Sequence, residues 1–143
     1  MITIHAAPAL SHREERVINM LKIKKMTDQQ LNNELSRMEM HRLGWKLVGD
    51  TGPWIKPDGS YSSGRYRDYC TELASLEIQR EAINIDAEQY MRNLEKVAVH
   101  PAHHKGEDLI SYEVAAWMAN ASPRERAEAA YTLFNTGLDV DHE

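Results

Sequence analysis

The sequence predicts an α+β fold that is mostly helical, with five or six helices around a small antiparallel β-hairpin or meander. Along most of the chain, capping signals are followed by apolar residues at helical spacing, which is typical of amphipathic helices. Residues 44–69 differ, since they contain five glycines, two prolines, two tryptophans and three tyrosines. Such a composition indicates turns and short strands. A chain of 143 residues is long enough for one domain with its own core.

The first two helices are indicated by capping boxes, which pair Ser11 with Glu14 and Thr27 with Gln30. We expect residues 1–25 to form a basic amphipathic arm, because residues 1–26 carry a net charge of +3. Its apolar stripe is short and must dock on another helix or subunit to persist. The stripe consists of Val17, Ile18 and Leu21. Residues 26–143 are predicted to form a single α+β domain, whose first helix ends near Arg42.

The glycine-rich region predicts a hairpin or meander that needs helices on one face to be stable. We place strands at Trp45–Val48, Trp54–Lys56 and Ser60–Tyr61, separated by turn signals. The helical pattern returns from Asp68 and runs to His100, where the following proline ends it. A second capping box, Asp86 with Gln89, predicts a bend near Asn84. The predicted apolar face of this helix consists of Leu73, Ala74, Leu76, Ile78, Ala82 and Ile83.

Two further helices complete an acidic, helical C-terminal half, since residues 72–143 carry a net charge of −8. One is predicted for Glu107–Asn120, and the other begins at Ser122 and Pro123, with Glu125 completing a capping box and Gly137 as the stop. The inward side chains of the first are predicted to be Ile110, Val114, Trp117 and Met118. Those of the second are Ala127, Ala130, Tyr131 and Phe134.

Composition excludes several classes of protein. With 42% apolar and 27% charged residues, the chain is neither disordered nor collagen-like. The net charge of −5 argues against whole-surface attraction to long nucleic acid or to a membrane. A single cysteine, Cys70, excludes an internal disulfide framework. Since the start lacks a signal peptide and no apolar run could span a bilayer, we expect the protein in the cytoplasm.

No motif indicates catalysis, and we expect neither an enzyme nor a cofactor. His100, His103 and His104 beside Glu107 and Asp108 could ligate zinc, but without a second ligand cluster a solvated polar loop is the preferred interpretation. Cys70 as a nucleophile would need a histidine from elsewhere in the fold, and a small buried apolar side chain is the simpler interpretation.

The glycine-rich region also combines aromatic and basic residues, which suits a nucleotide pocket. Aromatic rings stack on bases, and Arg or Lys side chains hold phosphates. The candidate ligand-binding residues are Trp45, Trp54, Lys56, Tyr61, Arg65, Tyr66 and Arg67. The two tryptophans are better explained as core-facing strand residues, which leaves Arg65 and Arg67 as the stronger ligand candidates.

Five short motifs occur in an order that resembles the phage ABA-sandwich domain family. They are MTDQQL at 26–31, LGW at 43–45, WIKPDG at 54–59, YRDYCT at 66–71 and ASPRERAEAA at 121–130. The resemblance implies a small phage or prophage accessory protein in which helices flank an antiparallel sheet. The chain departs from the family in its first 25 residues and in the strong helical pattern of residues 72–98. The phage Thoeris anti-defence sponges have a similar architecture, an analogy at the level of fold.

These observations favour two functional hypotheses. The first is a non-enzymatic phage protein that counteracts host antiviral defence by binding, with a nucleotide-derived immune signal sequestered between copies of a homo-oligomer. The alternative is a phage protein that inhibits or adapts a host protein by direct contact, through its acidic helices or its N-terminal arm.

Overall fold

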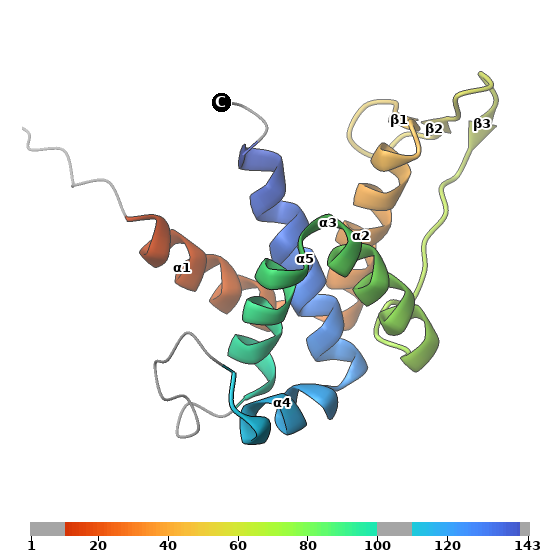
Figure 1. The fold of residues 1–143 in the computed structure, drawn as a ribbon. Coiled ribbons are helices and arrows are strands. Elements are labelled where there is room, and N and C mark those ends of the chain that lie inside the picture. Colours follow the sequence, from red (N-terminus) through yellow and green to blue (C-terminus); the bar gives the residue numbers. More distant parts are fainter. Residues whose placement is uncertain (1–10, 100–109, 141–143) are drawn as a thin grey trace, which may run out of the picture.

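The computed structural model describes residues 11–99 and 110–140. This part of the chain folds into five helices and a small antiparallel sheet, which confirms the mostly helical α+β class (Figure 1). The helices are α1 (His12–Lys25), α2 (Asp28–Arg42), α3 (Glu72–Ala98), α4 (Tyr112–Ala119) and α5 (Pro123–Val140). The strands are β1 (Lys46–Leu47), β2 (Trp54–Ile55) and β3 (Tyr61–Ser62), in the order β1-β2-β3. None of the helices in the described ranges has the length and apolar character that a bilayer crossing requires.

Helix α5 forms the centre of the bundle, where it packs against α1, α2 and most extensively α3. The face of α5 toward its neighbours carries the small side chains Ala127 and Ala130, which are fully buried and let the helix axes approach closely. Tyr131 and Phe134 extend this buried face, as predicted. The sheet lies beyond the C-terminal end of α2, at the edge of the bundle (Figure 1).

Local capping chemistry starts α1, α2 and α5 where the sequence predicts. The side chains of Ser11 and Thr27 accept hydrogen bonds from the backbone amides three residues later, at 3.2 and 3.1 Å. At α2 the box is complete, because the Gln30 side chain accepts from the Thr27 amide at 2.9 Å. The same reciprocal pair, Ser122 with Glu125, opens α5. These bonds satisfy amides that have no partner inside a helix.

Several element ends differ from the prediction, and side-chain bonds explain some of the shifts. Helix α3 begins at Glu72 rather than Asp68, because the Asp68 carboxylate accepts from the Cys70 amide and holds a turn. Helix α4 begins at Tyr112, capped by Ser111, rather than at Glu107. Strand β3 covers Tyr61–Ser62 instead of Ser60–Tyr61, since the Ser60 amide donates to the Asp58 carboxylate and holds a turn there. Helix α5 continues past Gly137, so this glycine is not the predicted stop.

The predicted inward faces of α3 and α4 are partly wrong. Ala74, Ile78 and Ala82 of α3 are buried, but Leu73, Leu76 and Ile83 are exposed. On α4, Val114 and Met118 are buried, whereas Trp117 and the preceding Ile110 are exposed. Helix α3 therefore packs through a narrow stripe at i, i+4 spacing and keeps a second apolar stripe at the surface.

Candidate functional site

The strand register places the predicted ligand-binding residues on two faces of the sheet. Leu47, Trp54 and Ser62 lie opposite one another across the three strands, and so do Lys46, Ile55 and Tyr61. Directly opposed residues of antiparallel strands project to the same face. Trp54 therefore points to the inner face, toward α2, while Tyr61 points to the outer face, where it is 70% exposed.

Trp54 is closed to solvent. Its ring has no exposed area, its edge meets the His41 ring at a centroid distance of 5.1 Å, and its Nε1 donates to the Tyr66 hydroxyl at 3.3 Å. Gly64 passes so close that a Cβ there would stand 3.2 Å from the indole. The core-facing interpretation therefore holds for Trp54, whose ring is not accessible for stacking on a ligand.

Trp45 and Lys56 form a pair at the end of the sheet. Trp45 precedes β1 and Lys56 follows β2, and strand alternation puts both on the inner side with Trp54. The Lys56 ammonium lies 5.2 Å from the centroid of the half-buried Trp45 ring, a cation–π contact. This pair is the part of the predicted pocket in which a ring and a cation come together at the surface.

The two arginines differ in their environment. Arg65 is exposed, and its backbone amide donates to the Met40 sulfur at 3.3 Å. Arg67 is held by the protein itself: its guanidinium pairs with Glu77 and lies over the Tyr69 ring, and its amide donates to the Ser36 hydroxyl. The hydrogen bond to Glu77 raises the pKa of Arg67. Arg67 thus fastens the segment before α3 to the helices.

The seven candidates therefore do not meet in one concave surface. Trp54 is sealed in the interior, Arg67 is engaged in an ion pair with Glu77 at the surface, and Tyr61 projects from the opposite face. Tyr66 is half exposed, and its hydroxyl accepts the hydrogen bond from the Trp54 indole. These residues build and anchor the sheet. Of the seven candidates, the Trp45–Lys56 pair and the exposed Arg65 remain accessible to a ligand.

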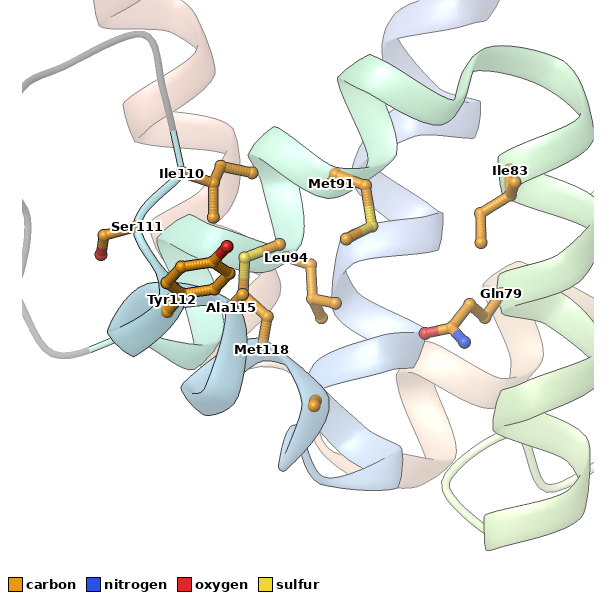
Figure 2. Close-up of a pocket in the computed structure, with 10 residues that line it drawn as sticks. Gln79, Ile83, Met91, Leu94, Ile110, Ser111, Tyr112, Ala115 and Met118 are labelled. Carbon is orange, nitrogen blue, oxygen red and sulfur yellow. The ribbon is translucent and has the colours of Figure 1, made fainter.

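A hollow that the sequence did not indicate lies between α3 and α4. We call it the α3–α4 groove, and its volume is about 520 Å³. Met91 and Leu94 lie in its middle, with side chains of the first half of α3 on one side and of α4 on the other (Figure 2). Its lining is Gln79, Ile83, Met91, Leu94, Ile110, Ser111, Tyr112, Ala115, Met118 and Ala119. The lining is largely apolar, and Tyr112 at the rim is 97% exposed.

A kink in α3 makes this groove. Asp86 has φ −158° and ψ 92°, outside the helical region, and its carboxylate caps the following turn by accepting from the Gln89 amide at 3.1 Å. The predicted bend near Asn84 is therefore confirmed, two residues further along. Because the helix changes direction there, Ile83 before the kink and Met91 after it border one hollow.

Cys70 does not have the environment of an activated nucleophile. The side chain is half-buried, and its sulfur lies 3.6 Å from the Asn32 side-chain oxygen. Burial, with the nearby Asp28 carboxylate, raises the pKa of the Cys70 thiol to about 11. A thiolate is the reactive form of cysteine, so this environment disfavours nucleophilic attack.

Within the described ranges, no cluster of three or more His, Cys, Asp or Glu side chains is arranged to hold a metal ion. The predicted loop with His100, His103 and His104 lies outside the described residues.

Comparison of the chain with protein-family models, with curated proteins and with solved structures finds no match. The resemblance to the phage ABA-sandwich family therefore stays a prediction.

Proposed function

We propose that the protein works without chemistry of its own, by direct contact with another polypeptide, and that the α3–α4 groove is the docking surface. The observation that carries this proposal is an apolar hollow of about 520 Å³ at the surface of the bundle. Contiguous exposed apolar surface marks interaction sites in proteins.

The shape of the groove favours a polypeptide over a small molecule. Small-molecule sites bury most of their ligand, whereas several side chains at the rim of this groove remain open to solvent, although Leu94 and Met118 at its floor are buried. Ile83, Ile110 and Tyr112 are 38%, 44% and 97% exposed. Leu76 and Leu73 lie seven and ten residues before Ile83, on the same side of α3, and they are exposed as well.

A selection from a display library of helical peptides tests this proposal, with the full chain as bait. We expect enrichment of peptides with apolar residues at i, i+3 and i+4, because these fit an apolar groove. Ala115→Glu and Ile83→Glu should each weaken the selected peptides by about tenfold or more, since a carboxylate would be buried on binding. Both positions are exposed, so both variants should fold.

Tyr61→Glu is the control, because Tyr61 is also an exposed apolar side chain but lies on the outer face of the sheet. Peptides that bind all three variants as they bind the unmodified chain would refute the groove as the docking surface. The wider role, a phage accessory protein that counteracts host defence by binding a host protein, rests on the family resemblance.

Nucleotide sequestration is the second candidate, and the Trp45–Lys56 pair with the exposed Arg65 is the observation that favours it. A thermal-shift screen with cyclic dinucleotides and cyclised ADP-ribose compounds should then raise the melting temperature, since a ligand at a hundredfold excess over its Kd adds about 2.7 kcal/mol. The shift, measured against each variant's own melting temperature, should be lost in Arg65→Ala with Lys56→Ala and kept in Ile83→Glu. No shift with any nucleotide would reject this candidate.

A further inference from the structure

Helix α1 turns two exposed apolar side chains away from the bundle. Ile18 and Leu21 are 37% and 54% exposed, and they lie three residues apart on one side of the helix. Ile23 comes five residues after Ile18 and therefore lies on the opposite side, where it is almost fully buried. A helix of 14 residues is marginal in water unless one face is packed, so the outward face is suited to a partner.

The C-terminal end of α1 is fixed on the bundle. The Arg124 guanidinium of α5 donates to the backbone oxygens of Ile23 and Met26, at 2.9 and 2.8 Å. From this attachment α1 projects sideways from the bundle (Figure 1). The chain therefore presents Ile18 and Leu21 outward on a helix whose direction is set.

Two charged residues continue this outward face along α1. Glu14 lies four residues before Ile18, and Lys25 lies four residues after Leu21. The four positions thus follow the alternating spacing of four, three and four residues that forms the seam of a coiled coil. Both charged side chains are exposed, and within residues 11–99 and 110–140 neither has a hydrogen bond or an ion pair. The other acidic and basic residues of the helix occupy positions outside this seam.

The seam is complementary to a second copy of itself that runs in the opposite direction. A two-fold axis between residues 19 and 20 places Ile18 opposite Leu21 of the second copy, and Glu14 opposite its Lys25. In a parallel pair each of these charges would instead meet the same charge. Beside the seam, Glu15 and Lys22 follow Glu14 and Leu21 on one flank, and the antiparallel pair brings these opposite charges together as well. Charge complementarity therefore selects the antiparallel arrangement.

We propose that two copies of this chain form a dimer through an antiparallel pair of α1 helices. Ile18 and Leu21 of both copies form its apolar centre, and an ion pair between Glu14 and Lys25 closes each end. The two bundles lie on opposite sides of the helix pair, because the seam faces away from the buried Ile23. Two helices of 14 residues make a smaller contact than standard interfaces, so we expect a dissociation constant in the micromolar range. The inference goes beyond the docking function proposed for the α3–α4 groove and does not depend on it.

Sedimentation equilibrium of the full chain at low salt, over a range of concentrations, tests the proposal. The unmodified protein should form a dimer, and Leu21→Glu should raise the dissociation constant by about tenfold or more, because it places carboxylates in the apolar centre. Leu73→Glu is the matched control, since Leu73 is an exposed leucine on α3, and it should leave the dimer intact. Added salt should weaken the unmodified dimer, because its ion pairs lie at the surface.

Charge reversals test the antiparallel register. Glu14→Lys and Lys25→Glu should each raise the dissociation constant by about fivefold or more, because each puts like charges at both ends of the helix pair. In an equimolar mixture of the two variants, both ends of the heterodimer again join opposite charges, so association should recover. Lys46→Glu, an exposed site on the sheet with the same change of net charge, is the control. Alone it should dimerise like the unmodified chain, and with Glu14→Lys it should form fewer heterodimers than Lys25→Glu does.

Three results would overturn the proposal: a monomer at about 500 µM and low salt, a dimer that Leu21→Glu leaves intact, or a mixture of the reversed chains that associates no better than either chain alone. If circular dichroism showed that Leu21→Glu unfolds α1, the mixture would still decide, since both of its chains keep the apolar centre. Peptides selected on the α3–α4 groove should bind Leu21→Glu as they bind the unmodified chain. Failure of the dimer would therefore leave the docking function standing.

Discussion

Replacing Trp54 with alanine is expected to release the three-stranded sheet from α2. The indole is fully buried and carries the hydrogen bond to Tyr66, and deletions of buried tryptophans cost about 3–5 kcal/mol. Strands of two residues have little stability of their own, so this side chain supplies most of the attachment of the sheet.

Amide hydrogen exchange measures this effect. In Trp54→Ala the amides of Val48 and Lys56, which close the two turns of the sheet, should lose their protection, while amides in the middle of α3 keep theirs. Tyr61→Ala is the control, because Tyr61 is exposed on the other face and its loss should change protection little. Unchanged protection at Val48 and Lys56 in Trp54→Ala would contradict the assignment of the indole as the anchor.

Replacing Arg124 with alanine is expected to lower the free energy of unfolding by about 3 kcal/mol, since it strips a buried carboxylate of its partner. Arg124 pairs with Glu128 at 3.3 Å, and the Glu128 side chain is 8% exposed. The change also removes the bonds to the carbonyls of Ile23 and Met26, so α1 loses its joint to α5. Urea titration measures the loss. Arg92→Ala, at an exposed pair with Glu88, is the control and should cost under about 0.5 kcal/mol.

The deficit of Arg124→Ala should depend on pH. Burial raises the pKa of Glu128 above its ordinary 4.5, and Arg124 opposes this rise, so removing Arg124 raises the pKa further. A carboxyl whose pKa is raised by folding binds its proton more tightly in the folded state, so stability increases as the pH falls through the raised pKa toward 4.5. The difference in unfolding free energy between the unmodified chain and Arg124→Ala should therefore be largest at neutral pH and smaller near the ordinary pKa. A constant difference would mean that Glu128 does not carry the effect.

Features set by neighbouring residues could be predicted from the sequence. Capping at Thr27 and Ser122 depends on bonds that span three residues, and both helix starts agree with the prediction. The bend at Asp86 is local in the same way. The burial of Trp54 also follows from strand alternation over the helices.

Features that depend on contacts between residues distant in sequence could not be predicted. Leu73 and Ala74 are equally suited to an apolar helix face. Ala74 is buried and Leu73 is exposed because α3 packs against the face of α5 that carries small side chains. The predicted pocket assumed that neighbours in sequence are neighbours in space, but strand register puts Tyr61 and Trp54 on opposite faces. The groove combines side chains of α3 and α4, and the burial pattern of neither helix alone indicates it.

The non-helical backbone at Asp86 has a consequence for which sequence changes the α3–α4 groove can tolerate. The shape of the groove depends on the angle between the two halves of α3, and the hydrogen bond from the Gln89 amide to the Asp86 carboxylate stabilises that angle. Residues that line the groove can therefore be substituted one by one. Such substitutions change which partner side chains bind there, but they do not close the groove. If α3 were a straight helix through residue 86, the groove would be lost even with every lining residue unchanged.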